Sequence, residues 1–414
     1  MSAEKPKILL SEGSSLSSRE AITALGLAGH RVELVSSDPL CLGRFSRFVS
    51  RLHQAPASGA DPDGYLAAVT DVVKSRRIDV LLPVHEQAYL FAAARKRLPS
   101  GLGIALADFE AFEQVQSKAG LADLLMRLKV PQPNTDIVRS ADEFAADRPY
   151  PFFVKAAFGT ASVGVWRVGD AHRRDAVLLQ LEAQNAFAEG LLVQAAISGT
   201  LERTQAVFDH GRPVACHIYR QVAEGPGGGD VLKISVVDAP VRETVARIGQ
   251  ALQWHGALSF DYIRDHETKT PYFIDANPRL VEPMNAWFSG VDLPGALLQV
   301  SLGESPQAQA DGRAGVLTRL GLMGLSDIAL HRQHRREILR EIALLASSSG
   351  RYRGSREELV PLLTDPCCAI PLAVVVARLL LTPQAAIRFT DSTVAAYSLT
   401  PQAIHRLRAW QHSA

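Results

Sequence analysis

Residues 256–280 constrain the fold of this chain more than any other stretch. Two apolar runs, 257–263 and 271–276, flank a polar segment, which is the pattern of a β-hairpin with aromatic and β-branched strands. With the turn centred in that polar segment, antiparallel pairing sets Asp261 directly opposite Asp275. The segment therefore predicts two carboxylates that face each other across a pair of strands.

The same hairpin predicts a cation between these acids. Because side chains alternate along a strand, Asp275, Asn277 and Arg279 share one face, and Asp261 joins them there. Like charges directly opposite on a sheet repel, and two carboxylates with an amide oxygen are hard ligands suited to Mg²⁺, which Mn²⁺ could replace. Arg279 would then place a positive charge beside a phosphate. The alternative is an ordinary exposed hairpin whose acids are merely solvated.

The chain opens with a strand–helix–strand pattern. Strands are expected at 7–10 and 31–35 with a helix between them, which implies a parallel sheet with ligands near the carboxyl ends of its strands. The loop after the first strand, SEGSSLSS, lacks a G-x-G-x-x-G fingerprint, which argues against an NAD enzyme. His85 and Glu86 follow a later strand, where substrate contacts often lie, but helix capping is the favoured interpretation.

Two lysines stand in positions that call for an anion. Lys118 lies in the first turn of a predicted helix, where the dipole disfavours a cation unless a phosphate is bound, although a surface lysine with a solvated head is the plain alternative. Lys155 lies inside the apolar strand 151–157 and must find an anion or leave the interior. The loop after it consists of small residues whose backbone N–H groups can close over phosphates. Its candidate contacts are Gly159, Thr160, Ser162 and Gly164.

These landmarks resemble, in order, those of the ATP-grasp superfamily, and in particular its carboxylate–amine ligases and carbamoyl-phosphate-synthase-like proteins. The sequence Ile-Asp-Ala-Asn-Pro-Arg at 274–279 is similar to the E-x-N-P-R metal motif of that superfamily, with Asp275 in place of the usual glutamate. The strand of Lys155 and the loop behind it resemble the family's phosphate-binding strand and glycine-rich loop. Ala156 replaces a common proline there, and Phe158 stands where a small residue is frequent.

The resemblance implies an ATP site. The segment LLVQAAISG at 191–199 is similar to the hinge strand that holds adenine, with Gln194 and Ile197 at the contact positions. Gln194 occupies the place of a carboxylate, so the acidic acceptor for the adenine amino group is missing. Glu202 would bind ribose hydroxyls, unless it forms a surface salt bridge. Lys118 and Lys155 would hold phosphates.

The resemblance also implies a reaction. ATP-grasp ligases transfer the γ-phosphoryl group to a carboxylate, and an amine or thiol then attacks the acyl phosphate. The implied Mg²⁺ ligands are Asp261, Asp275 and Asn277, and the implied catalytic residues are Arg279 and Lys155. The expected protein is an ADP-forming ligase that joins small-molecule carboxylates and amines. The alternative is a non-catalytic nucleotide-binding regulatory protein that retains the fold, suggested by the missing hinge acid and the shorter Asp275.

The expected fold class is α/β with three parts. Residues 1–108 form a leading Rossmann-like domain with a parallel sheet. Two α+β subdomains then clamp the nucleotide: residues 109–192 carry the glycine-rich loop, and residues 193–305 carry the metal site. Residues 316–414 form a mainly helical C-terminal domain in which no family pattern is recognised.

Composition excludes several other classes. A net charge of +1 gives no general affinity for nucleic acid. Four cysteines without paired spacing fit a reducing cytosol. The longest apolar stretch, 367–381, contains Pro371 and Arg378 and cannot span a bilayer, and the N-terminal apolar run is too short for a signal peptide. We expect a cytoplasmic protein without nucleic-acid or membrane partners, with a homodimer as the commonest soluble assembly.

Overall fold

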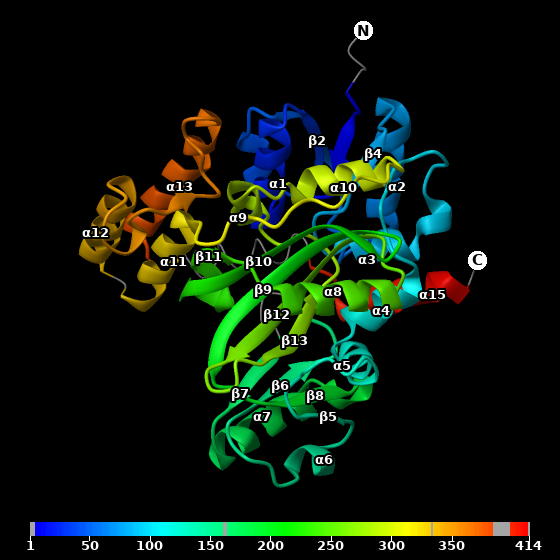
Figure 1. The fold of residues 1–414 in the computed structure, drawn as a ribbon, viewed down its shortest axis with the longest axis vertical. Helices are drawn as coiled ribbons and strands as arrows, with labels where there is room; N and C mark the ends of the chain where they lie inside the picture. Colours follow the sequence, from blue (N-terminus) through cyan, green and yellow to red (C-terminus); the bar gives the residue numbers. More distant parts are fainter. Residues whose placement is uncertain (1–4, 160–163, 333, 384–397, 413–414) are drawn as a thin grey trace.

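The computed structural model describes residues 5–159, 164–332, 334–383 and 398–412. Its strands form three sheets, and Figure 1 shows them as successive layers along the long axis. The leading unit lies at one end, the largest sheet in the middle and a small sheet at the other end. The predicted α/β class with a leading parallel sheet is confirmed.

The leading unit is built on a parallel sheet with the strand order β3-β2-β1-β4. Strands β1 and β4 are short, apolar and fully buried, as expected for strands covered by helices on both faces. Beyond β4, the sheet continues only as a single parallel bridge between Val80 and Gly103 in the described residues. The elements are β1 (Ile8–Leu10), α1 (Leu16–Leu27), β2 (Val32–Ser36), η1 (Leu42–Phe45), β3 (Val49–Gln54), α2 (Pro62–Arg76), β4 (Val80–Leu82), α3 (Gln87–Ala93) and η2 (Arg95–Arg97).

Two consecutive helices, α4 (Phe109–Gln116) and α5 (Lys118–Arg127), lead to the small antiparallel sheet. Ser117 separates them and caps α5, because its side chain accepts a hydrogen bond from the backbone N–H of Gly120. The small sheet has the order β5-β8-β6-β7 and buries one apolar face against α6 and α7. Its elements are β5 (Thr135–Val138), α6 (Ala141–Ala145), β6 (Phe152–Ala156), β7 (Val165–Val168), α7 (Ala171–Ala183), η3 (Ala186–Glu189) and β8 (Leu191–Ala195).

The central sheet has seven strands in the order β13-β12-β9-β10-β11-β14-β15, antiparallel except for the last pair. The main apolar cluster joins this sheet to the leading unit through Phe91, Phe112, Trp254 and Leu258. The elements are β9 (Gly199–Asp209), β10 (Arg212–Glu224), η4 (Pro226–Gly228), β11 (Asp230–Val236), α8 (Ala239–Ala251), β12 (Gly256–Asp265), β13 (Pro271–Asn277), α9 (Met284–Ser289), α10 (Leu293–Ser301), β14 (Leu317–Arg319) and β15 (Arg356–Glu357).

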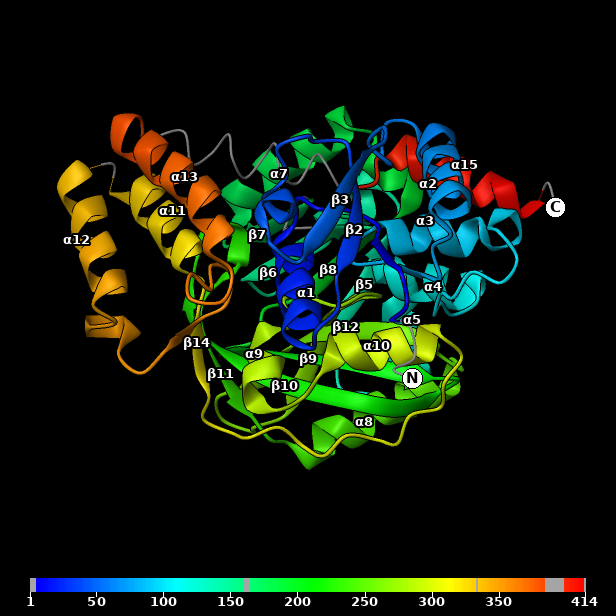
Figure 2. The same ribbon diagram turned by 90° about the horizontal axis from the view of Figure 1, so that it is seen from above.

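The chain after β14 does not pack as one body. Helices α11 (Gly321–His331), α12 (Arg335–Ala346) and α13 (Ala369–Leu381) share a small apolar cluster on one side of the molecule, and η5 (Gly350–Tyr352) and η6 (Pro366–Cys368) lie between them. Helix α15 (Pro401–His412) lies on the opposite side, beside α2 and α3 of the leading unit (Figure 2). Within the described ranges, no helix is both long enough and apolar enough to cross a membrane.

Candidate functional site

The β12–β13 hairpin holds the two predicted metal-binding aspartates in the predicted register. Asp261 pairs with Asp275, and Ser259 pairs with Asn277. The register shifts just after Asp261, which is typical of a β-bulge. On its other edge, β12 pairs Asp261 with Arg203 of β9. The predicted pairing is therefore confirmed, and both carboxylates lie on one face of the central sheet.

Three cations surround this pair of carboxylates. The ammonium group of Lys118 lies 2.8 Å from both carboxylate oxygens of Asp275. The ammonium group of Lys155 donates a 2.8 Å hydrogen bond to the backbone carbonyl of the residue before Asp275. Nε of Arg203 lies 3.3 Å from Oδ1 of Asp261. Because these cations come from α5, β6 and β9, the hairpin is where both predicted subdomains meet.

Burial and these charges shift the pKa values of the group. Burial raises the pKa of Asp261, and the nearby Arg203 only partly opposes this. Burial also acts to raise the pKa of Asp275, but the charges of Lys118 and Lys155 lower it overall. Burial lowers the pKa of Lys155 to about 8, against the opposing pull of Asp275. The cluster thus holds an ionised Asp275 beside a lysine that gives up its proton unusually easily.

The base of the predicted phosphate loop lies directly beside these lysines. The backbone N–H of Lys118 donates to the carbonyl of Ala157 at 3.0 Å, and that of Ala156 donates to the carbonyl of Gly164 at 2.8 Å. Gly164 has φ +77°, which favours glycine, and Gly159 is exposed where the loop begins. The structure therefore brings Lys118, Lys155 and both ends of the loop together. The two other predicted loop contacts lie outside the described residues: Thr160 and Ser162.

Gln194 lies on the same face of the small sheet as Lys155. Pairing between β6 and β8, together with side-chain alternation, places both on the face opposite the apolar core. The Gln194 amide donates from Nε2 to Oγ1 of Thr135 at 3.2 Å, and its oxygen takes no part in this bond. Ile197 follows β8 and is half-buried. The predicted adenine strand thus borders the same space as the phosphate-side lysines.

Glu202 lies apart from this group. Its neighbour Arg203 faces the aspartate pair, so alternation along β9 turns Glu202 to the opposite face of the sheet. Its buried carboxylate accepts hydrogen bonds from Nε of Arg220 at 2.7 Å and Nη2 of Arg264 at 3.1 Å. These contacts correspond to the salt-bridge alternative, although the carboxylate itself is buried rather than on the surface. The structure does not bring Glu202 to the predicted ribose position.

Arg279 connects the hairpin to the leading unit. Its Nη2 donates to Oδ1 of Asn277 at 3.3 Å, and its Nε lies 3.6 Å from Oε1 of Glu86. Glu86 precedes α3 but makes no side-chain capping bond, so the capping interpretation of this residue is wrong. Its carboxylate instead accepts from Gln116 at 2.9 Å and pairs with Arg279. Its position just beyond a strand of a parallel sheet was the signal for this contact.

Two residues of the same region were missed from the sequence, Arg203 and Lys233. Arg203 lies between Asp261 and Asp230, and its Nη1 is 2.6 and 2.7 Å from the two carboxylate oxygens of Asp230. Lys233 of β11 is fully buried, and its ammonium lies 2.7 Å from Glu282 and 2.8 Å from Glu358. Burial acts to lower the pKa of Lys233, but these two carboxylates raise it overall. Alternation along β9 and β11 could have signalled both cations once the strand register was known.

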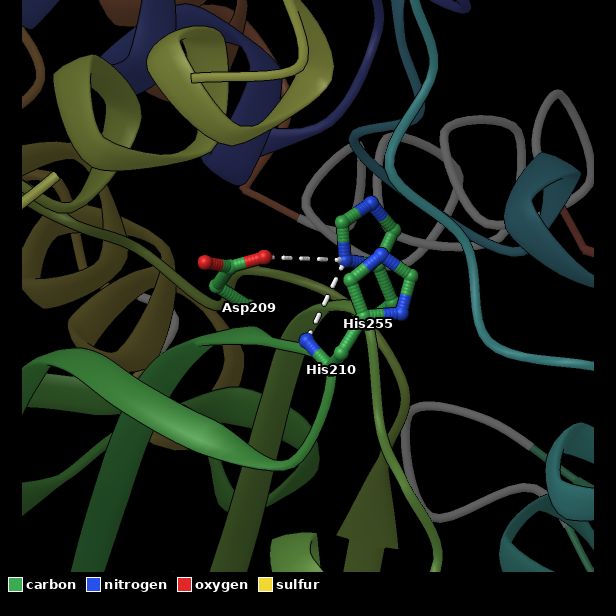
Figure 3. A group of neighbouring side chains, drawn as sticks. All are labelled: Asp209, His210 and His255. Atoms are coloured by element: carbon green, nitrogen blue, oxygen red, sulfur yellow. Dashed lines mark hydrogen bonds and ion pairs between the residues drawn. The ribbon is translucent and has the colours of Figure 1, made fainter. Parts of the chain in front are cut away.

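A separate cluster of Asp209, His210 and His255 lies at the tip of the β9–β10 hairpin (Figure 3). The two imidazoles are stacked, with ring centroids 4.0 Å apart. Nδ1 of His255 accepts from the backbone N–H of His210 at 3.4 Å, and Asp209 accepts from Arg212 at 2.9 Å. These bonds engage Nδ1 of His255 and one carboxylate oxygen of Asp209. Asp209 also stands six positions beyond Arg203 on one strand, roughly 20 Å from the aspartate pair.

Comparisons with known proteins place this arrangement among known folds. No protein-family model matches the chain. Acetyl-CoA carboxylase 1 of rice is 25% identical over 166 residues, and acetyl-CoA carboxylase 1 of Arabidopsis thaliana is 24% identical over 172 residues. Each match covers 37% of this chain and 7% of the relative, so the chain spans a small part of these proteins.

Solved structures match over most of the chain. The biotin carboxylase domain of 2-oxoglutarate carboxylase from Hydrogenobacter thermophilus has a TM-score of 0.62 at 14% identity, covering 76% of this chain and 74% of that one. N5-carboxyaminoimidazole synthetase from Staphylococcus aureus has a TM-score of 0.60 at 14% identity, covering 80% and 86%. L-amino acid ligase from Bacillus licheniformis has a TM-score of 0.56 at 17% identity, covering 73% and 76%.

These neighbours are ATP-grasp proteins, and the likeness to them concerns the arrangement of sheets and helices. The same arrangement brings Lys118, Lys155 and the Asp261–Asp275 pair of this chain to one place. The chain therefore has the fold of ATP-grasp proteins, and the predicted resemblance is confirmed for the fold.

Proposed function

We propose that this protein is an ATP-dependent ligase that joins a carboxylate to an amine, or to a thiol, through an acyl phosphate. The observation that carries the proposal is the convergence of Lys118 and Lys155 on the Asp261–Asp275 pair. Two opposed carboxylates with buried lysines beside a glycine-rich loop form a site for a metal-bound polyphosphate. The fold supports the general kind of enzyme, because the neighbours include a carboxylase domain solved with MgADP and bicarbonate and an amino acid ligase.

The residues fit a divalent cation by the chemistry of their donor atoms. Asp261, Asp275 and Asn277 would supply oxygen ligands to Mg²⁺, which neutralises charge on the transferred phosphoryl group when bound. Asp275 is held by Lys118 in the structure, so this aspartate is already placed where a cation is favoured. A bound triphosphate would give Lys118 a second anionic partner.

The remaining cations would hold the phosphates and the transferred group. Lys155 and Lys118 approach the site from two different elements and would contact phosphate oxygens. Arg279 would stabilise charge on the transferred group, because its guanidinium lies beside Asn277. Gln194 and Ile197 would border the adenine. The ribose role of Glu202 is left out of the proposal.

Positioning and charge neutralisation are sufficient for this chemistry. The carboxylate oxygen would attack the γ-phosphorus, the bond to the ADP oxygen would break, and ADP would leave. The amine nitrogen would then attack the acyl carbon, the carbon–oxygen bond to phosphate would break, and the nitrogen would lose a proton. No serine, cysteine or histidine nucleophile is needed.

The proposal is tested by ADP release with Mg-ATP and a panel of amino acids and other small carboxylates, with amines or thiols as acceptors. The expected result is acceptor-dependent ADP release that disappears in Lys155→Met, a variant that keeps length and loses charge. Mg-ATP binding in wild type without turnover on any pair would instead support the alternative of a nucleotide-binding regulatory protein. Absence of nucleotide binding in wild type would overturn both.

A further inference from the structure

Arg408 of α15 lies where three parts of the chain meet. Its Nε donates to Oε1 of Glu113 in α4 at 2.9 Å, and its Nη1 donates to Oε2 of Glu189 at 3.2 Å. The carbon centre of its guanidinium also lies 4.8 Å from the centroid of the Phe158 ring. Glu189 ends the turn before the predicted adenine strand β8, and Phe158 is the second residue after β6. One guanidinium thus contacts residues that flank both strands predicted to hold the nucleotide.

Phe158 belongs to a short stem between Lys155 and the glycine-rich loop. Two backbone bonds already fix this stem, from the N–H of Ala156 to Gly164 and from the N–H of Lys118 to Ala157. The stack of Arg408 on Phe158 adds a third restraint, which comes from the C-terminal helix. The stem is therefore held between a predicted phosphate-binding lysine and α15.

Helix α15 is a firm anchor for this restraint. Ile404 and Leu407 are buried in the main apolar cluster with residues of the leading unit, and Phe158 packs against the same cluster. Nε2 of Gln411 donates to the carbonyl of Ala93 in α3. Arg408 therefore links a helix fixed on the leading unit to the small subdomain across α4.

We propose that Arg408 is a positioning residue for the nucleotide site, acting through Phe158 and Glu189. It orients the stem 156–158, and with it the start of the glycine-rich loop and the predicted phosphate contact of Lys155. Its effect on nucleotide affinity rests on the proposed function, whereas its effect on the stem does not. The aromatic residue at position 158, where the superfamily frequently has a small one, supplies the surface that the guanidinium needs.

The first test compares Arg408→Ala with Arg406→Ala in the full-length protein. Arg406 lies on the same helix but pairs with Asp63 of the leading unit, so it is a matched control. Mg-ATP affinity is measured by calorimetry, with KM and kcat where turnover is found. Arg408→Ala should weaken nucleotide affinity about five- to tenfold with little change in kcat, and Arg406→Ala should stay within about twofold. Arg408→Lys, which keeps the charge but loses the planar fork, should be intermediate.

The second test measures amide hydrogen exchange in the nucleotide-free proteins. The amides of Lys118 and Ala156, which close the stem, should exchange faster in Arg408→Ala than in wild type and stay unchanged in Arg406→Ala. Phe158→Leu, which leaves the Glu113 and Glu189 contacts in place, should have the same effect on these amides. This variant replaces Arg408→Ala in the test if Arg408→Ala does not fold.

The outcomes separate this proposal from the proposed function. Suppose that the wild type binds no nucleotide but the stem amides exchange faster in Arg408→Ala. The role of Arg408 in ordering the stem would then be supported, and the ligase proposal would be rejected. Unchanged exchange at both amides in Arg408→Ala and Phe158→Leu would overturn the positioning role. Faster exchange with unaltered Mg-ATP affinity, in a protein whose wild type binds the nucleotide, would also overturn it. The order of the stem would then have no effect on nucleotide binding.

Discussion

Lys118 and Asp275 lie 157 positions apart in the chain, yet the lysine ammonium is 2.8 Å from both oxygens of the aspartate carboxylate. Lys118 is nearly fully buried, and the Asp275 side chain is 32% exposed. A buried ammonium group needs such a partner, because an unpaired charge is costly in the interior. The contact joins the first turn of α5 to the β12–β13 hairpin, so it couples a predicted phosphate ligand to a predicted metal ligand.

Asp275→Asn is expected to abolish most Mg²⁺-dependent turnover. The substitution removes the charge that would bind the cation and adds no bulk. Its amide oxygen can still accept a hydrogen bond from the Lys118 ammonium, so the hairpin should keep its fold at some cost in stability. Removing one electrostatic contributor of this kind typically costs about 10²- to 10³-fold in rate. Turnover as a function of Mg²⁺ concentration is the measurement.

Asp265→Asn is the matched control for that substitution. Asp265 is the last residue of β12, and its carboxylate accepts from the backbone N–H of Thr268 in the turn of the same hairpin at 2.7 Å. It should leave the Mg²⁺ dependence unchanged. Equal activity of Asp275→Asn and Asp265→Asn would exclude Asp275 from the metal site.

Glu202→Gln is expected to lower stability without changing nucleotide affinity. The carboxylate is buried on the opposite face of the sheet and neutralises Arg220 and Arg264. Loss of its charge leaves Arg264 with less compensation, at an expected cost of about 1–3 kcal/mol. Urea denaturation and Mg-ATP titration on the same variant separate the two effects. A large loss of ATP affinity, with stability retained, would contradict this prediction and support the ribose-binding role of Glu202.

The local parts of the site could be predicted from the sequence. The register of Asp261 and Asp275 followed from one hairpin, because a short turn fixes which residues pair. The place of Lys118 followed from a helix start. Glu202 shows the limit of such reasoning, since the face that a residue of β9 occupies depends on how that strand pairs with β12, more than fifty positions later. A one-residue change of phase exchanges Glu202 with Arg203.

The long-range parts could not be predicted for a related reason. Lys233 pairs with Glu358 across strands β11, β14 and β15, which come together only in the complete sheet. The C-terminal helices contribute to separate apolar clusters, but no local sequence pattern predicts that α15 packs against the leading unit. That placement depends on Ile404 and Leu407 finding a surface built by residues some 300 positions earlier.

His217 is expected to make stability fall as the pH is lowered. It is buried, its Nε2 lies 2.7 Å from Oδ1 of Asn285, and burial lowers its pKa to about 4. Between about pH 6.5 and pH 4 the unfolded chain binds a proton that the folded protein does not, so stability rises with pH across this window. Above it, the histidine is neutral in both states and has no further effect.

The measurement is urea denaturation of wild type and His217→Gln from pH 4.5 to pH 7.5. The difference between the two proteins isolates the histidine, because Glu357, whose pKa burial raises to about 7, acts in the opposite direction over an overlapping range. The stability of wild type relative to the variant should drop by up to about 2–3 kcal/mol toward the acid end. A constant difference would show that His217 is not held neutral.

Asp365→Ala is expected to destabilise the protein strongly. Its carboxylate lies 2.8 Å from Nη2 of Arg19, both side chains are fully buried, and it also accepts from Oγ of Ser46 and from the backbone N–H of Arg47. Asp365, a single residue in the segment that follows β15, therefore accepts hydrogen bonds from three donors of the leading unit. Removing it leaves a buried guanidinium without compensation, at an expected cost of about 3–5 kcal/mol in the free energy of unfolding.

The control for this last substitution is Arg174→Ala, which breaks the partly exposed pair with Asp175. An exposed pair of this kind should contribute no more than about 0.5–1 kcal/mol. Chemical denaturation should therefore separate the two variants by several kcal/mol. If Asp365→Ala instead unfolds with the same midpoint as Arg174→Ala, the Arg19 guanidinium must reach water or another partner. The contact of Asp365 with the leading unit would then add little to stability. A strong loss would establish that this segment stabilises the unit on which the candidate site is built.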